Sequence, residues 1–273
     1  MGQSPYDKIL QKGTHLRIGG IKMPVQLQAK LIKKEQLKPD IFKFYLSSKE
    51  ITDIAKPGQF IEIRVTEGLD PFLRRPISIY NIDKENGILE IIFRVQGKGT
   101  EILSRKKEED LVDIIGPLGY GTFKFEGYKN IAVLGGGIGV FPLYELAKNA
   151  SKSATVNTYL GFRNKEAVVV EEEFEKVSNK LVITTDDGSY KIHGFAINEL
   201  KKDIEDGKID AIFACGPLPL LKAAQNLAKE KNIPCQISLE EKMGCGLGVC
   251  LGCAVEVVTG GYEHVCKQGP VFD

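Results

Sequence analysis

The chain has 273 residues, with 37 Lys and Arg against 36 Asp and Glu, and a formal net charge of +1. This balance argues against binding to nucleic acid or to an anionic membrane, because both need a basic excess or a basic face. No stretch approaches the roughly 20 consecutive apolar residues of a membrane span. The length suggests roughly two domains.

Residues 1–22 form a polar start to the chain. They contain no apolar stretch of the kind that a secretory signal requires. We therefore expect an uninformative extension at residues 1–22 and a cytoplasmic protein. In a reducing compartment cysteines serve metal or redox sites more often than disulfides, so the six cysteines of the chain indicate such a site.

Residues 23–126 show short alternating patterns of apolar and polar residues. Residues 60–65 show an alternating pattern, and residues 87–95 form a second strand-like run after a turn-like stretch. A single short helical pattern occurs in this region, after Gly99. The region is expected to fold as a small antiparallel β-barrel or sandwich.

Residues 127–236 follow a different pattern, in which strands alternate with helices. Strands are expected at residues 131–134, 155–160, 181–184 and 210–214, and helices around residues 141–148, 171–174 and 195–202. This alternation is typical of an α/β domain with a parallel sheet. A third, short segment at residues 237–273 is dense in cysteine and glycine.

Four cysteines lie in this last segment. Cys245, Cys250 and Cys253 follow the pattern C-x4-C-x2-C, and Cys266 comes after twelve further residues. The first three match the loop of a plant-type [2Fe–2S] site, whose iron ions need four thiolates in all. A turn signal at residues 259–261 predicts a hairpin that brings Cys253 and Cys266 together. The segment is therefore predicted to bind a [2Fe–2S] cluster.

A structural zinc site is the main alternative for these four cysteines. Such a site usually has two C-x2-C pairs, whereas this segment has one. The departure from the plant-type pattern is the short spacing before the fourth cysteine. The two remaining cysteines, Cys215 and Cys235, stand apart in apolar surroundings, and Cys235 is expected to be a small buried side chain.

The β-rich region carries an Arg-x-x-Ser motif, from Arg75 to Ser78. An Arg fork can neutralise a pyrophosphate, and a hydroxyl group three residues later can reach a flavin ring. A second stretch, residues 96–100, resembles a turn that leads into the N-terminus of a helix, where free N–H groups suit a phosphate. Each motif also occurs in ordinary loops, but together they indicate a flavin site.

Glycines follow the first strand of the α/β region, at residues 135–139. A glycine-rich turn between a strand and a helix lets the backbone approach a pyrophosphate. The alternative is an ordinary tight turn, because Val140 breaks the standard G-x-G-x-x-G spacing. The sequence Cys-Gly-Pro at residues 215–217 follows what we take as the last parallel strand, and ligands dock at this end of such sheets.

The order of these motifs resembles the ferredoxin–NADP reductase superfamily over nearly the whole chain after residue 23. Two stretches are similar to those of one family within it: the loop at residues 245–253, called the cluster loop below, and the ending Val-Cys-Lys-Gln-Gly-Pro-Val-Phe at residues 265–272. This family comprises the electron-transfer subunits of NAD-dependent, two-subunit dihydroorotate dehydrogenases. The resemblance implies an antiparallel β-barrel FAD domain, an α/β nucleotide-binding domain and a small [2Fe–2S] segment.

The resemblance also implies which residues bind each cofactor. FAD would be held by Arg75, Pro76, Ile77, Ser78, Ile92, Phe93, Arg94, Gly99 and Thr100. The pyridine nucleotide would lie against Gly135, Gly137, Gly139, Cys215, Gly216 and Pro217. The cluster ligands would be Cys245, Cys250, Cys253 and Cys266.

The implied function is electron transfer between NAD and an FMN-containing catalytic subunit, in an assembly of two copies of each chain, for pyrimidine (UMP) synthesis. No catalytic acid or base is expected in this chain, and its three histidines are interpreted as ordinary residues. Arg163 and Lys165 leave NADP open as the nucleotide. Two alternatives also stay open: a subunit of a hydrogenase or flavin-based transhydrogenase, and a binding module with structural zinc.

Overall fold

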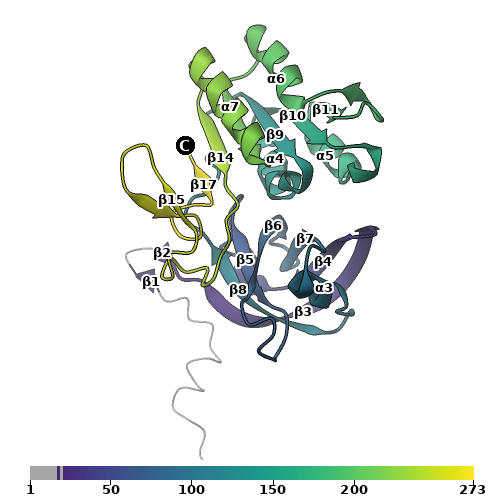
Figure 1. Ribbon diagram of the computed structural model, residues 1–273, viewed down its shortest axis with the longest axis vertical. Helices are drawn as coiled ribbons and strands as arrows, with labels where there is room; N and C mark the ends of the chain where they lie inside the picture. The colour runs from purple at the N-terminus through teal and green to yellow at the C-terminus, as the bar shows by residue number, and fades with distance from the viewer. Residues whose placement is uncertain (1–16, 19–20) are drawn as a thin grey trace, which may run out of the picture.

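The computed structural model describes residues 17–18 and 21–273 (Figure 1). The predicted extension at residues 1–22 thus lies almost wholly outside the described residues. Its described parts are two short antiparallel strands, β1 (Arg17–Ile18) and β2 (Ile21–Lys22). No helix in the described part of the chain is long and apolar enough to cross a membrane.

A closed antiparallel barrel forms the lower part of the molecule in Figure 1. Its strand order is β3-β4-β7-β6-β5-β8, which confirms the barrel. The strands are β3 (Val25–Lys38), β4 (Ile41–Ser47), β5 (Phe60–Arg64), β6 (Arg75–Asp83), β7 (Ile88–Arg94) and β8 (Leu111–Leu118). Two short helices, α2 (Lys49–Thr52) and α3 (Lys98–Ser104), lie in the connections. Alternate side chains such as Ile61 and Ile63 fill the barrel core, as expected for period-two strands.

A seven-stranded sheet forms the upper part, in the order β12-β11-β10-β9-β13-β14-β17. Six of its strands are parallel, and β17 is antiparallel to β14. The strands are β9 (Asn130–Gly136), β10 (Thr155–Phe162), β11 (Lys180–Thr185), β12 (Ile192–His193), β13 (Ala211–Cys215), β14 (Cys235–Ser238) and β17 (Val271–Phe272). The predicted parallel α/β domain is therefore confirmed.

Helices cover both faces of this sheet. On β9, Ile131 and Val133 pack with the face that carries Phe174, whereas Ala132 and Leu134 pack with the face that carries Leu221. The first face is covered by η1 (Gly137–Leu143), α4 (Tyr144–Ala150) and α5 (Glu171–Val177), and the second by α6 (Ala196–Glu205) and α7 (Leu218–Lys231). A short 3-10 turn, η2 (Lys165–Ala167), follows β10. This two-sided burial explains why β9 is a continuous apolar run.

One sequence interpretation of this sheet was wrong. The strand at residues 210–214 was taken as the last parallel strand, but β14 follows and pairs with β13 in parallel register. Strand β14 has only four residues, of mixed polarity (Cys-Gln-Ile-Ser), so its pattern was too short to stand out. It crosses the expected domain boundary between residues 236 and 237. The domain boundaries after residues 22, 126 and 236 stay predictions.

The barrel and the sheet are held together through α4. The ring of Tyr144 stacks on that of Tyr80 in the barrel, with 4.5 Å between centroids. The buried carboxylate of Glu145 accepts a hydrogen bond of 2.9 Å from the backbone N–H of Ile82. Lys148 donates to the carbonyl of the same barrel residue at 3.1 Å. These contacts fix the barrel against the face of the sheet that α4 covers.

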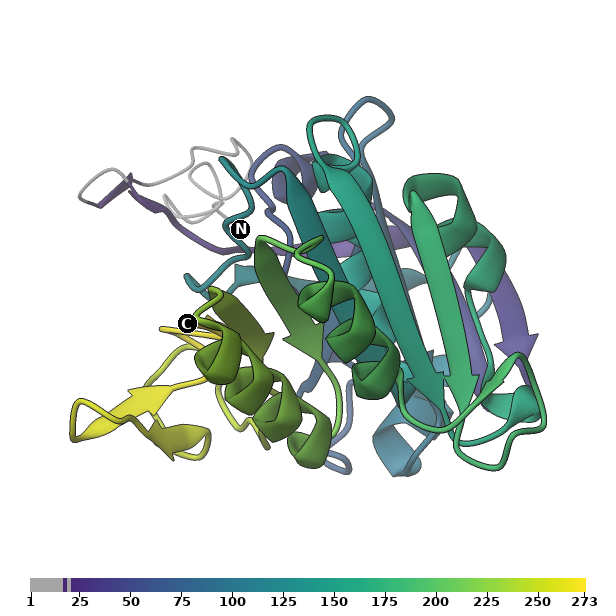
Figure 2. The same ribbon diagram turned by 90° about the horizontal axis from the view of Figure 1, so that it is seen from above.

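The C-terminal segment leaves the sheet after β14 and returns to it through β17. Between them lies a hairpin of β15 (Ala254–Glu256) and β16 (Tyr262–His264), which projects to the left in Figures 1 and 2. The backbone of Leu239 donates to the carbonyl of Pro270, and that of Tyr120 donates to the carbonyl of Lys267. The segment is therefore attached to both larger parts.

Substitution of Val271 with alanine tests this attachment. Val271 is buried in the core that joins the sheet to the barrel, so losing two methyl groups there should lower the free energy of unfolding by on the order of 1–2 kcal/mol. Urea unfolding followed by circular dichroism measures the change. Val258→Ala is the matched control, because Val258 is fully exposed on the hairpin. Equal effects of the two substitutions would show that β17 does not support the fold.

Candidate flavin, nucleotide and cluster site

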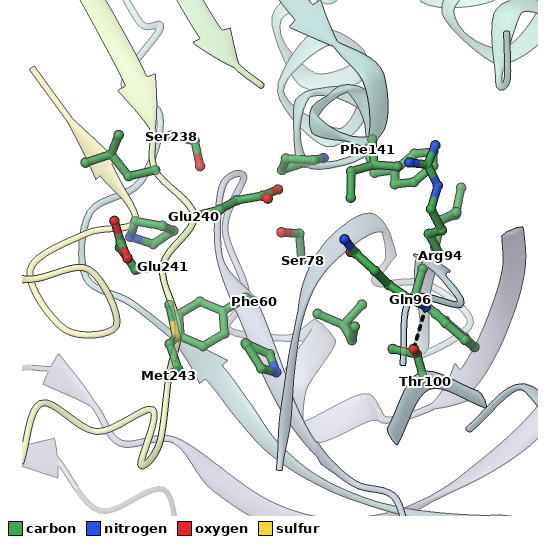
Figure 3. Close-up of a pocket in the computed structure, with 18 residues that line it drawn as sticks. Phe60, Ser78, Arg94, Gln96, Thr100, Phe141, Ser238, Glu240, Glu241 and Met243 are labelled. Carbon is green, nitrogen blue, oxygen red and sulfur yellow. Dashed lines mark hydrogen bonds between the residues drawn. The ribbon is translucent and has the colours of Figure 1, made fainter. Parts of the chain in front are cut away.

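A cavity of about 250 Å³ lies where the barrel, the sheet and the C-terminal segment meet (Figure 3). Seven of the predicted FAD residues line it: Pro76, Ile77, Ser78, Ile92, Phe93, Arg94 and Thr100. Its remaining lining residues are Phe60, Gln96, Ile138, Phe141, Pro142, Ser238, Leu239, Glu240, Glu241, Met243 and Pro270. The structure thus brings together most of the residues that the family resemblance implied for FAD.

Strand pairing sets the position of Ser78. It lies on β6 directly opposite Phe60 of β5, and Figure 3 shows its hydroxyl group pointing into the cavity. The hydroxyl can therefore donate to, or accept from, a flat polar ring placed there. The wall around it is largely apolar, which suits an aromatic ring system with a polar edge.

The two neighbouring arginines have different roles. Arg74 donates two hydrogen bonds, of 2.9 and 3.0 Å, to the buried carboxylate of Asp113. Arg75 donates to the carbonyl of Leu73 at 2.6 Å, and no carboxylate within the described residues forms an ion pair with it. The charge of Arg75 is therefore free to meet an anionic ligand.

Arg75 lies against the N-terminus of α3. A Cβ atom built on Gly99 would lie 2.3 Å from Arg75 Nε, so only glycine allows this approach. The hydroxyl of Thr100 accepts hydrogen bonds from the backbone N–H groups of Gln96 at 2.9 Å and Gly97 at 3.3 Å, which fixes the turn. A depression there is lined by Val95, Gln96, Gly97, Lys98, Glu101, Ile102 and Arg105. A guanidinium group beside a helix N-terminus suits a pyrophosphate.

The glycines after β9 differ in what they allow. A Cβ atom on Gly139 would lie 2.5 Å from the Cα atom of Gly216, so these glycines let the loops after β9 and β13 touch. A Cβ atom on Gly135 would meet Val140 at 2.8 Å, which is core packing. Gly137 faces open space with a φ of +56°, so it is the glycine of the three most exposed to a ligand.

The region after β13 holds a buried thiol. Cys215 is fully buried, and burial together with the nearby Glu240 carboxylate raises the pKa of this thiol far above its usual value. The thiol is therefore protonated at neutral pH and is not a nucleophile. Gly216 joins it to Pro217, which caps the N-terminus of α7.

Sequence reasoning missed the residues that follow β14. Figure 3 shows the Glu240 carboxylate directed toward the cavity, with Ser238 beside it on the same segment. Glu240 is exposed as a whole residue, but the protein packed around its carboxyl group raises the pKa of that group. The signal for these residues is that they follow a parallel strand, because ligands dock at the carboxyl ends of such strands. Strand β14 is too short for its sequence pattern to reveal it.

The cluster loop directs backbone N–H groups at its cysteines. Cys245 Sγ accepts from the N–H groups of Leu247 at 3.3 Å and Val249 at 3.4 Å, and Cys266 Sγ accepts from that of Gly248 at 3.1 Å. Burial raises the pKa of Cys245, but these backbone donors outweigh it and bring the pKa to about 6. Such donors stabilise thiolates.

The four thiols form two pairs. Cys245 lies next to Cys250, and Cys266 lies next to Cys253, whose Sγ accepts the Cys266 N–H at 3.4 Å. The prediction that the hairpin brings Cys253 close to Cys266 is confirmed. Across the described residues, no three His, Cys, Asp or Glu side chains converge on one point as a single metal ion requires. Two pairs of thiols match a binuclear cluster, in which each iron takes two cysteine ligands.

The cavity lies between a β-barrel and a parallel sheet with glycine loops, and a segment with four cysteines lies beside it. This is the arrangement of an iron–sulfur flavoprotein of the ferredoxin reductase type. Comparisons with known families agree. The oxidoreductase FAD-binding domain matches residues 28–125, and the iron–sulfur cluster binding domain of dihydroorotate dehydrogenase B matches residues 240–273.

The chain belongs to the family of the dihydroorotate dehydrogenase B (NAD(+)) electron transfer subunits. It is 39% identical to the subunit of that name from Desulforamulus reducens in an alignment of 249 positions that covers 89% of this chain and 95% of the relative. It is 37% identical to the Bacillus cereus (strain Q1) subunit, over 89% of this chain and 94% of that one.

Solved structures show the same fold. A chain from the structure of NADH-dependent reduced ferredoxin–NADP oxidoreductase has a TM-score of 0.81 and 32% identity, over 93% of this chain and 89% of that chain. The Neisseria gonorrhoeae ferredoxin NADP+ reductase with bound FAD and NADP has a TM-score of 0.63 and 18% identity, over 76% of this chain and 91% of that one. The second similarity concerns the fold alone.

Gly99→Ala tests the approach of Arg75 to α3. The added methyl group would overlap the guanidinium group and displace it, which removes a charge-assisted hydrogen bond worth about 1.5–3 kcal/mol. The dissociation constant for FAD should therefore rise at least roughly tenfold, as measured by flavin fluorescence on titration of the apoprotein. Gly68→Ala is the control, because its new methyl group makes only an ordinary contact of 3.5 Å. Unchanged FAD affinity in Gly99→Ala would contradict the assignment.

Proposed function

We propose that this chain transfers electrons between NAD(H) and the FMN-containing catalytic subunit of a dihydroorotate dehydrogenase, in pyrimidine synthesis. The observation that carries the proposal is the position of the cavity. It is bordered on one side by residues of the glycine loop, such as Ile138, and on another by the segment that leads into the cluster loop. A flavin placed there would lie between a nucleotide and a one-electron carrier.

The cofactors supply the redox chemistry, since FAD exchanges two electrons with a nicotinamide and one with a [2Fe–2S] cluster. In the proposal, the cluster ligands are Cys245, Cys250, Cys253 and Cys266. Their pairing and the backbone N–H groups aimed at them support this assignment. In the proposal, the remaining cysteines, Cys215 and Cys235, are not cluster ligands.

The barrel residues would hold and orient the flavin. Ser78 offers a hydroxyl group at the cavity, and Arg75 offers an unpaired positive charge beside α3 for the pyrophosphate. The other proposed FAD residues are Pro76, Ile77, Ile92, Phe93, Arg94, Gly99 and Thr100. Most of these present backbone or apolar atoms, which exclude water and leave orientation to the few polar groups.

Phe60 separates the cavity from the cysteines. It lines the cavity, is 4 % exposed, and packs in one apolar group with Cys253 and Cys266. Met243 also lines the cavity and packs against the same apolar group as the two cysteines. This packed wall excludes water between flavin and cluster while keeping them close.

The nucleotide side combines the loops after β9, β13 and β14. Gly135, Gly137 and Gly139 with the Cys215–Pro217 turn would border the nicotinamide nucleotide. The buried thiol of Cys215 stays protonated, and Glu240 provides a carboxyl group that can hold a proton near the cavity. Arg163, exposed after β10, is a candidate contact for a 2′-phosphate, so NADH and NADPH should be compared in the same assay.

The partner would dock on the cluster loop. Leu247, Val249 and Leu251 are 48%, 77% and 66% exposed, and Cys250 between them is exposed too. An exposed apolar patch of this kind suits a protein interface, and it would place the cluster next to the partner's FMN. We expect two copies of each subunit and a cytoplasmic location, where the six cysteines stay reduced.

A second candidate is the electron-transfer chain of a flavin-based bifurcating NADH-dependent ferredoxin–NADP oxidoreductase. The 32% identity to a chain of that enzyme favours it as the runner-up. The two candidates differ in the partner alone, because the barrel, sheet and cluster segment serve both.

Reconstitution with the catalytic subunit tests the function. The chain is co-expressed with the dihydroorotate dehydrogenase catalytic subunit of the same organism, and the purified complex is assayed for dihydroorotate-dependent NADH formation, with sizing to determine the stoichiometry. We expect one complex with this activity, and none for the catalytic subunit alone. Failure to associate, together with association with a transhydrogenase large subunit, would favour the second candidate.

Cys250→Ser should remove the cluster and leave FAD bound. Serine is a poor ligand for iron in such a cluster, while Cys250 is exposed, so the barrel is unaffected. Iron, acid-labile sulfide and flavin are measured on the purified protein, with Cys235→Ser as a control that keeps all three. Loss of iron and flavin to the same extent would mean that the cluster loop is not independent of the FAD site.

A further inference from the structure

Strand β5 has two buried faces. Ile61 and Ile63 point into the barrel core and are fully buried. Phe60 and Glu62 alternate with them and so lie on the outer face, yet Glu62 is only 1 % exposed. The cluster segment covers this face, since Phe60 packs against Cys253. A carboxyl group is therefore enclosed between the barrel and the cluster segment.

Glu62 touches the cluster loop itself. A Cβ atom built on Gly246 would lie 2.7 Å from Glu62 Cγ and 2.9 Å from Oε1. Gly246 follows Cys245 directly and has a φ of +67°, a conformation that favours glycine. Both the turn and the approach of the carboxyl group thus depend on this glycine. Neither carboxyl oxygen has a hydrogen-bond partner in the described part of the chain.

A structural ion pair does not account for this carboxyl group. Arg74, the arginine that acts more strongly on it, is already held by Asp113 at 2.9 Å, and Arg75 turns to a backbone carbonyl. Burial raises the pKa of Glu62 to about 7, although Arg74 lowers it. An apolar side chain would fill the same space without the cost of burying a carboxyl group, so its presence points to a role at the loop that it touches.

We propose that Glu62 tunes the cluster: in its ionised form it places a negative charge against the Cys245 turn and lowers the cluster's reduction potential. Reduction adds one electron to the cluster, and a nearby negative charge opposes this addition in a buried, weakly screened site. Burial and nearby charge are established means of tuning such potentials. A lower potential makes the cluster a better donor of electrons to FAD.

The test uses the purified full chain loaded with FAD and cluster. The reduction potential of the cluster is measured at alkaline pH by redox titration, followed by the electron paramagnetic resonance signal of the reduced state. Glu62→Gln keeps the shape but not the charge, and should shift the potential upward. Glu62→Asp keeps the charge, and should stay closer to the wild-type value. Glu85→Gln, in the exposed turn after β6, is the matched control and should cause no shift.

An unchanged potential in Glu62→Gln, or equal shifts in the Gln and Asp variants, would overturn the proposal. If the Glu62→Gln protein does not retain the cluster, the Glu62→Asp protein provides the test. A cluster that is retained in Glu62→Asp with a reduction potential near the wild-type value supports the role of the charge. Loss of FAD together with the cluster in both variants would make Glu62 a structural residue of the barrel. The measurement needs neither NAD nor a partner subunit, so its outcome is independent of which partner the proposed function names.

Discussion

The pairing of β17 with β14 is the constraint on which the site depends. After β14 the chain forms the cluster loop, and the pairing of β17 with β14 then brings it back to the edge of the parallel sheet. Backbone hydrogen bonds join the two ends of this segment to each other and to Tyr120, so the loop begins and ends beside the barrel. The cysteines then lie beside Phe60, and Pro270 closes the cavity wall. The short antiparallel pairing of β17 with β14 thus fixes where the cluster loop lies relative to the cavity.

Much of the fold could be predicted from local patterns. The alternation in residues 60–64 and the apolar run of β9 are strong signals because burial on one or two faces leaves a period in the sequence. The cysteine spacing was equally informative, because a loop that wraps a cluster fixes the distance between its ligands. The pairing of Cys253 with Cys266 followed from the hairpin turn.

What the sequence could not reveal depends on tertiary contact. Strand β14 has only four residues, so the cavity residues that follow it, Glu240 among them, had no recognised element to mark them. Glu62 occupies an outward position of an alternating strand, where a charged residue is expected to be solvated. Only the covering segment, nearly 200 residues later in the sequence, makes it a buried group. Likewise, only the structure shows that Asp113 forms an ion pair with Arg74 and not with its neighbour Arg75.

The late position of β17 in the chain also constrains how the protein is made. The barrel is synthesised first and the sheet second, and each has its own core. Residues 270–271, however, contribute a wall of the cavity and part of the core between barrel and sheet. The flavin cavity therefore has all of its walls only after the cysteine loop has been synthesised and the residues that follow it have folded back onto the sheet.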